Sequence, residues 1–231
     1  MSGTVAPRYS RNVQALSPQE CETLQGKRVC VVGCGGLGGY CLEQLARIGV
    51  GHLVAIDSDV FEPSNLNRQI LASEATLGQP KVAAARERLA LVNPEVSVET
   101  HQVRLDSGNA GELIAGCDCV IDALDNRPSR IDLAHACQEA GIPLVYGAIG
   151  GWFGQVCTVF PGDVSFIDIY GSTEGQGIQK QEGNLPFTAA VTASFQVAEC
   201  VKVLLDKPDL LRNRLLMIET LYGSCEVMDL A

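Results

Sequence analysis

Residues 29–38 read VCVVGCGGLG, in which four apolar residues pass directly into a turn rich in glycine. The apolar run predicts a short buried strand, and the spacing of apolar residues over Leu37–Ile48 predicts the helix that follows. Between a strand and a helix, glycines allow a tight turn and let a phosphate approach the free N–H groups of the helix N-terminus. We therefore predict a nucleotide-binding turn; the alternative is a turn that only packs the strand against the helix. The glycines concerned are Gly33, Gly35, Gly36 and Gly38.

An acidic residue follows the next predicted strand. Asp57 ends the run that begins at His52, and it stands about 20 residues after the last glycine of the turn. An acid at this position accepts hydrogen bonds from ribose hydroxyls, and NAD, FAD and ATP all remain open as ligands. The alternative for Asp57 is a carboxylate that caps its own loop. We interpret Asp59, two residues further on, as solvated or capping.

Short apolar strands alternate with helices along the first two-thirds of the chain. Such alternation predicts crossover units and an α/β fold with a doubly wound, Rossmann-like, mostly parallel sheet. The strands are expected at Arg28–Val32, His52–Ile56, Ser97–Gln102, Cys119–Asp122 and Pro143–Tyr146, and the helices at Leu37–Ile48, Lys81–Val92, Asn109–Ala115 and Ser129–Ala140.

The last third of the chain has a different pattern. The region that ends in Gln155–Phe160 is predicted to form added, antiparallel strands, and Phe187–Leu205 returns to a helical period. Leu215–Glu219 and Ser224–Leu230 are predicted to be closing strands. The glycine-rich segment Asp163–Asn184 has no period and predicts a mobile loop or lid. Because we find no repeat and no low-complexity linker, we expect residues 1–231 to form a single domain.

Two cations and several amides follow Asp57. Residues 65–69 read NLNRQ, and Lys81 comes shortly afterwards. A triphosphate needs a guanidinium fork, an ammonium and amide donors, whereas the diphosphate of a dinucleotide is served by the glycine turn alone. This set therefore favours ATP over a redox cofactor. The alternative is that Arg68 and Lys81 are ordinary surface cations.

A further pair of acids ends the fourth predicted strand. Asp125 stands at the strand tip, beside the expected nucleotide crevice, and carboxylates together with phosphates are ligands that Mg²⁺ prefers. We predict Asp125 as the magnesium ligand and interpret Asp122 as buried and structural. The alternative for Asp125 is an N-cap of the helix that starts near Pro128.

The overall composition narrows the class of protein. The net charge of −10 disfavours a sequence-blind nucleic-acid binder. The ten cysteines include several inside apolar runs, and Met1–Pro7 is not an apolar leader, so we expect a reducing, cytoplasmic location. We find no apolar stretch near the roughly 18–20 residues that span a bilayer, and we expect no membrane association.

Taken together, these motifs resemble those of the ThiF/MoeB/HesA family, relatives of ubiquitin-activating enzymes. The resemblance implies a single ThiF-type adenylation domain that dimerises. It also implies the reaction: ATP-dependent adenylylation of the C-terminal carboxylate of a small ubiquitin-like sulfur-carrier protein ending in Gly-Gly, with release of pyrophosphate. The motifs in register are residues 8–11 (RYSR), 33–38 (GCGGLG), 57–59 (DSD), 65–69 (NLNRQ), 78–81 (GQPK) and 122–126 (DALDN).

The resemblance also implies a role for each matching residue. ATP and Mg²⁺ would lie over the glycine turn, with Asp57 on the ribose and Asp125 on the metal. The residues assigned to the phosphates are Asn65, Arg68 and Lys81, and Gln69 and Asn126 complete the nucleotide site. Arg11 would reach the phosphates of the neighbouring subunit, so that Arg11, Arg68, Lys81 and Asp125 are the expected catalytic residues. Because a carboxylate nucleophile is already ionised at neutral pH, no general base is needed.

The sequence departs from many relatives at two points. It has no Cys-x-x-Cys pair, so we expect no structural zinc. The stretch Gly171–Thr188 has no cysteine for a covalent link to the carrier, which leaves that step open. Two other functions also stay open: a dehydratase acting on threonylcarbamoyladenosine in tRNA, and a non-catalytic NAD(P)-binding module. The pathway, whether thiamine biosynthesis, molybdopterin synthesis or another use of sulfur, is not determined by the sequence.

Overall fold

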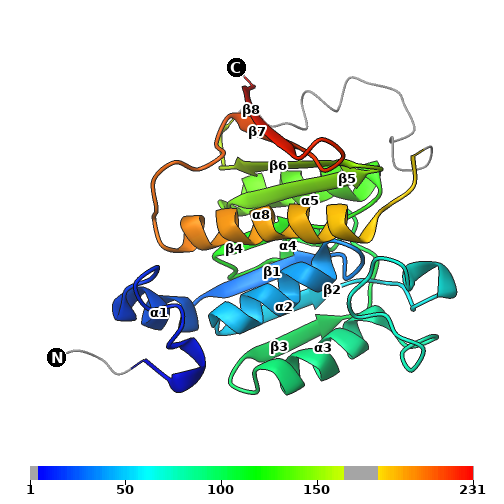
Figure 1. Ribbon diagram of the computed structural model, residues 1–231, viewed down its shortest axis with the longest axis horizontal. Helices are drawn as coiled ribbons and strands as arrows, with labels where there is room; N and C mark the ends of the chain where they lie inside the picture. The colour runs from blue at the N-terminus through cyan, green and yellow to red at the C-terminus, as the bar shows by residue number, and fades with distance from the viewer. Residues whose placement is uncertain (1–4, 164–181, 231) are drawn as a thin grey trace.

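The computed structural model describes residues 5–163 and 182–230, and the strands in these ranges form one eight-stranded sheet (Figure 1). The strand order is β3-β2-β1-β4-β5-β6-β7-β8, with the first five strands parallel and the last three antiparallel. The predicted α/β class and the added antiparallel strands are therefore confirmed. The strands are β1 (Arg28–Val32), β2 (His52–Ile56), β3 (Ser97–His101), β4 (Cys119–Asp122), β5 (Leu144–Gly150), β6 (Phe153–Val159), β7 (Arg214–Glu219) and β8 (Ser224–Asp229).

Helices cover both faces of the sheet and enclose two apolar cores. On one face pack α2 (Gly38–Ile48), α3 (Lys81–Val92) and α8 (Pro186–Leu204). On the other face pack α4 (Ala110–Leu113) and α5 (Arg127–Ala140). The predicted helix Asn109–Ala115 is reduced to the single turn of α4, which contains Gly111, a poor helix former. Ahead of β1, the helix α1 (Pro18–Gln25) has Ser17 as its N-cap, and the side chains of Ser17 and Glu20 form a capping box.

The order of the strands creates a crevice at the carboxyl ends of the parallel strands. From β1 the chain winds outward through β2 to β3, and then returns to the other side of β1 to add β4 and β5. The loops after β1 and after β4 therefore leave the sheet in opposite directions. Ligands of open α/β sheets bind at this switch point, outside the carboxyl ends of the strands.

We expected no apolar stretch long enough to span a bilayer, and helix α8 departs from that expectation. Over residues 186–204 it is long and apolar enough, with a mean hydropathy of 1.3, to cross a membrane by length and composition alone. Half of that window is buried inside the fold, however, and the core helix of a soluble protein meets the same criteria. Its buried Gln196 and Glu199 also bond to the sheet and to the segment before β7. The packing therefore accounts for the apolar composition of α8.

The N-terminal segment is attached to the C-terminal ends of α2 and α3. Tyr9 is 2% exposed, and its ring packs on Gly49, which ends α2 in the left-handed conformation (φ 101°). The Asn93 amide donates to the Tyr9 hydroxyl (2.7 Å) and to the Ala46 carbonyl (2.8 Å). Figure 1 shows this segment, in dark blue, at the end of the sheet where β1 begins. The segment that contains Arg11 is therefore held at the opposite end of the sheet from the crevice.

We expect Asn93→Ala to lower the free energy of unfolding by about 1–3 kcal/mol, because the buried Tyr9 hydroxyl and Ala46 carbonyl lose their donor. Urea denaturation measures the change. The matched control is Leu91→Ala on the same helix, whose side chain is 83% exposed, and we expect its effect to stay within about 0.5 kcal/mol. Equal effects from the two substitutions would show that Asn93 does not anchor the segment.

Candidate active site

A cavity of about 320 Å³ lies at the carboxyl ends of β1, β2 and β4. The glycine turn after β1 forms one wall, and the segment after β4 forms another. Most of the residues predicted for the nucleotide site line this cavity, namely Gly33, Gly35, Gly36, Asp57, Arg68, Gln69, Lys81, Asp125 and Asn126. Gly38, Asn65 and Arg11 do not belong to the lining. The topology thus brings together residues from five separate segments of the chain.

The fold requires some glycines of the turn and not others. Gly33 has a φ of 95°, and a Cβ there would lie 2.6 Å from the Ala123 carbonyl oxygen. A Cβ on Gly38 would lie 1.7 Å from the Gly33 carbonyl oxygen, so the turn itself requires both glycines. At Gly35 the nearest atom would be 3.5 Å away, which is ordinary contact. Packing therefore does not require a glycine at position 35, and its contact with a nucleotide stays a prediction.

We expect Gly35→Ala and Gly38→Ala to separate the requirement of the fold from nucleotide binding. Gly38→Ala should destabilise the fold by about 1–3 kcal/mol, because the added methyl overlaps the backbone. Gly35→Ala should leave the thermal midpoint nearly unchanged and weaken nucleotide binding by about tenfold, which is ~1.4 kcal/mol. Differential scanning fluorimetry and titration calorimetry measure the two quantities. Unchanged nucleotide affinity in Gly35→Ala would remove position 35 from the binding site.

Asp57 connects the end of β2 to the glycine turn. Its carboxylate accepts hydrogen bonds from the backbone N–H groups of Cys34 (2.7 Å) and Asp59 (2.8 Å). Burial raises the pKa of Asp57, while the nearby Lys81 charge and these hydrogen bonds act in the opposite direction. The loop-capping alternative is thus observed. Since Asp57 also lines the cavity, its contact with a ribose stays a prediction.

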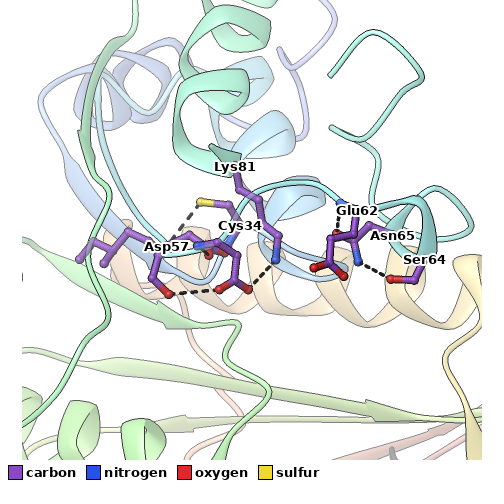
Figure 2. A network of polar contacts seen from close by, with 9 residues as sticks. Cys34, Asp57, Glu62, Ser64, Asn65 and Lys81 are labelled. Carbon is purple, nitrogen blue, oxygen red and sulfur yellow. Dashed lines mark hydrogen bonds and ion pairs between the residues drawn. The ribbon is translucent and has the colours of Figure 1, made fainter. Parts of the chain in front are cut away.

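Lys81 and Asp59 form an ion pair at the cavity. The Lys81 ammonium at the start of α3 lies 2.9 Å from the Asp59 carboxylate. Figure 2 draws this ion pair as the dashed line that leaves Lys81. The Lys81 side chain is 9% exposed, and that of Asp59 is 62% exposed. The pair with Lys81 lowers the pKa of Asp59. Asp59 is solvated as predicted, but it also fixes the direction of the Lys81 ammonium, which sequence reasoning did not identify.

The segment that follows β2 supplies the guanidinium. Arg68 donates to the Ser64 carbonyl and to the Asn67 side chain (both 2.9 Å), and its methylene groups lie beside Gly36. Gln69 is 6% exposed and lies beside Gly35. Arg68 and Gln69 therefore border the glycine turn directly.

Asn65 was expected to contact the phosphates, but in the structure its side chain bonds to residues of its own segment. Its amide oxygen accepts from the Glu62 N–H (3.0 Å), and its amide nitrogen donates to the Ser64 hydroxyl (3.4 Å), contacts drawn in Figure 2. These bonds hold the short 3-10 turn η2 (Pro63–Asn65). The structure shows Asn65 shaping the segment that carries Arg68, and its phosphate contact stays a prediction.

After β4, Asp125 and Asn126 occupy adjacent positions at the cavity. The N-cap of α5 is Asn126, whose side chain accepts from the Ser129 N–H (3.0 Å). The alternative of an N-cap at Asp125 was therefore wrong by one residue. Among residues 5–163 and 182–230, no three His, Cys, Asp or Glu side chains gather to hold a metal ion alone. The single carboxylate of Asp125 at this cavity still fits Mg²⁺, which is commonly bound by one or two carboxylates plus substrate phosphates.

The cavity also contains residues that sequence reasoning missed. Arg104 lines it from the segment just after β3, and Asn184 lines it from the segment before α8. Asp57 and Asp125 were predicted because each follows the end of a predicted strand. Arg104 also follows the end of a predicted strand, so the same reasoning could have identified it. Asn184 lies at the end of the segment for which a mobile loop was predicted. That prediction falls mainly on residues 164–181, which lie outside the described residues.

A doubly wound sheet, with a glycine turn, an acid and two cations around a cavity at its switch point, defines a nucleotide-binding α/β protein. The sequence matches the ThiF family over residues 9–231. The chain therefore belongs to the ThiF family, and the predicted family membership is confirmed.

Three curated relatives show what this family includes. The SAMP-activating enzyme E1 of Haloferax volcanii is 37% identical over 99% of this chain and 86% of its own length. The sulfur carrier protein adenylyltransferase of Thermus thermophilus is 36% identical over 94% of this chain and 84% of its own. The molybdopterin-synthase adenylyltransferase of Haemophilus influenzae is 33% identical, covering 92% of this chain and 89% of its own.

Solved structures agree on the fold. A crystal structure of Escherichia coli MccB with ATP superposes with a TM-score of 0.83 and covers 98% of this chain and 72% of its own. The two sequences are 22% identical, so the likeness concerns the arrangement of helices and strands.

Proposed function

We propose that the protein uses ATP to adenylylate the C-terminal glycine carboxylate of a small ubiquitin-like sulfur-carrier protein. The observation that carries this proposal is the cavity, where Lys81, Arg68 and Asp125 surround the glycine turn. Such a set suits the three phosphates of ATP better than the two of a dinucleotide. The names of the relatives support the same reaction: two are adenylyltransferases, of a sulfur carrier protein and of molybdopterin synthase, and the third is a SAMP-activating enzyme.

The chemistry requires charge neutralisation and positioning more than proton transfer. The carrier carboxylate attacks the α-phosphorus of ATP, the bond to the β-phosphate oxygen breaks, and pyrophosphate leaves with the bonding electrons. Lys81 and Arg68 stabilise the charge that develops on the phosphates, and the glycine turn supplies backbone N–H donors. Mg²⁺, when bound, would neutralise further phosphate charge, and Asp125 is the residue proposed to hold it.

We further propose that the active unit is a homodimer with shared sites. Arg11 is exposed and lies on a segment held at the opposite end of the sheet from the cavity of its own chain. A two-fold symmetric pair would let each N-terminal segment complete the partner's site. The proposal includes a cytoplasmic location, a single adenylation domain and a framework without zinc.

Pyrophosphate exchange tests the reaction. The purified chain is incubated with ATP, Mg²⁺, labelled pyrophosphate and a ubiquitin-like protein ending in Gly-Gly. Reversible adenylylation predicts label entering ATP only when the carrier is present. A carrier that lacks its last glycine is the matched control and should not support exchange. Exchange that is independent of the carrier would contradict the proposed substrate.

A further inference from the structure

Arg130 lies in the first turns of α5, beneath the tip of β4, and its side chain is 14% exposed. The guanidinium donates to the Asp122 carboxylate (3.0 Å), to the Gly147 carbonyl (3.0 Å) and to the Leu124 carbonyl. It also lies over the ring of Tyr146, 4.9 Å from the centroid. One side chain thus connects β4, the segment after it and β5.

The tip of β4 is held from the opposite face as well. Gln196 of α8 is 0% exposed and donates to the Asp122 carbonyl at 2.8 Å. A Cβ on Gly147 would lie 2.2 Å from the Gln196 side chain, so this approach is possible only beside a glycine. Asp122 is therefore held through its backbone from the α8 side and through its side chain from the α5 side.

These contacts hold the residues on either side of Asp125. The Leu124 N–H donates to the Asp122 carboxylate (2.9 Å), and the Leu124 carbonyl, whose carbon is bonded to the Asp125 nitrogen, accepts from Arg130. On the other side, Asn126 caps α5 through the Ser129 N–H (3.0 Å). Asp125 is thus presented at the cavity by a backbone whose two flanks are both held.

We propose that Arg130 is a positioning residue that presets the Asp125 carboxylate for the metal–phosphate part of the site. The inference rests on the proposed role of Asp125. Arg130 is not part of the cavity lining, so it acts through Leu124 and Asp122. A displacement of about 1 Å in a reacting geometry can cost on the order of 100-fold in rate, so holding this segment matters for catalysis.

The guanidinium is suited to this task in a way that an ammonium is not. Its planar fork presents five N–H donors in fixed directions, and here it serves acceptors on three separate residues. A lysine at the same position keeps the positive charge beside Asp122 but offers one compact donor group. Arg130→Lys therefore retains the ion pair and removes the simultaneous hold on Leu124 and Gly147.

Removing the charge alone would not be a clean test. Burial raises the pKa of Asp122, and Arg130 opposes this shift. Arg130→Gln would leave a buried carboxylate without its partner, which is strongly destabilising. The double variant Asp122→Asn with Arg130→Gln removes both charges and keeps an acceptor for the Leu124 N–H. The double variant therefore measures the loss of the contacts with the Leu124 and Gly147 carbonyls without the cost of an unpaired buried charge.

The experiment compares the wild type, Arg130→Lys and the double variant. Three quantities are measured: the thermal midpoint, the binding of Mn²⁺ to the ATP-loaded protein by electron paramagnetic resonance, and the Mg²⁺ concentration for half-maximal pyrophosphate exchange. For both variants we expect roughly tenfold weaker metal binding and a similar rise in the Mg²⁺ requirement. ATP affinity without metal should stay within about threefold, since the glycine turn and Lys81 are untouched.

Arg88→Gln is the matched control. Arg88 pairs with the buried Glu43 between α2 and α3, away from the cavity, so it shares the cost of disturbing a buried ion pair. We expect Arg88→Gln to change the thermal midpoint and leave Mn²⁺ binding unchanged. Folded Arg130 variants with wild-type Mn²⁺ binding and Mg²⁺ requirement would overturn the inference.

Asp125→Asn separates this inference from the proposed function. If Asp125→Asn leaves Mn²⁺ binding unchanged while exchange of the wild type still depends on the carrier, the Arg130 inference is overturned and the adenylation reaction stands. If the wild type shows no carrier-dependent exchange, the proposed function fails. The effect of Arg130 on Mn²⁺ binding with ATP is then still measured directly.

Discussion

Lys81→Ala is expected to reduce carrier-dependent pyrophosphate exchange by roughly 100-fold or more, as loss of a preorganised charge at a reacting phosphate does. The Lys81 ammonium lies 2.9 Å from the Asp59 carboxylate, so its direction at the cavity is set before a nucleotide binds. Asp59 is 62% exposed, so solvent can replace its partner, and the Asp57 carboxylate keeps the N–H donors of Cys34 and Asp59 when the nearby Lys81 charge is removed. The loss of the ion pair should cost only about 0–1 kcal/mol of stability.

The matched control is Lys27→Ala. Lys27 forms a 3.0 Å ion pair with Asp118, and neither residue lines the cavity. We expect the control to retain the wild-type exchange rate, whereas Arg68→Ala should lose activity as severely as Lys81→Ala. Initial exchange rates, with thermal midpoints to confirm folding, measure these effects. Rates near that of the wild type in both site variants would show that the two cations do not hold the phosphates.

A mixture of two inactive variants is expected to regain activity if the sites are shared. Arg11→Ala and Asp125→Ala should each be nearly inactive alone. In a mixed dimer, one site contains both defects and the other contains neither. After random equal mixing, about half of the dimers are mixed and each has one intact site, so on the order of a quarter of the wild-type activity should return.

The measurement needs proof that subunits exchange. Native mass spectrometry of isotopically labelled chains gives the fraction of mixed dimers, and exchange rates are taken on the same samples. Mixing Asp125→Ala with Lys81→Ala is the matched control, because both defects belong to the same half of the site and the neighbouring Arg11 cannot replace either. Confirmed subunit exchange without any return of activity in the Arg11 mixture would rule out action of Arg11 across the interface.

Local sequence patterns were sufficient to predict most of the strands and helices of the fold. The strand, glycine turn and helix over residues 28–48 follow from neighbouring residues alone, and β1, β2 and β4 have the predicted ends. Side chains that follow the carboxyl ends of parallel strands lie close together, because these ends are at the same side of the sheet. This principle correctly predicted that Asp57 and Asp125 line one cavity.

Contacts between distant segments could not be predicted in the same way. Asp59 was interpreted as solvated because its partner Lys81 stands 22 residues further along. The hydrogen bond from Asn93 to Tyr9 joins positions 84 residues apart, and nothing local to either residue signals it. The hold of Arg130 on Leu124 likewise depends on how α5 packs beneath β4. Such contacts arise only when elements defined by local patterns are packed together.

The most direct test of the central claim is the intact mass of the carrier after incubation with the purified protein, ATP and Mg²⁺. Pyrophosphatase is included to draw the reaction forward. The proposed function predicts that the carrier gains the mass of one adenylyl group, that hydroxylamine removes it as expected for a mixed anhydride, and that a carrier without its terminal glycine gains nothing. An unmodified carrier, under conditions where the protein is folded and binds ATP, would contradict the assignment of this chain as a sulfur-carrier adenylyltransferase.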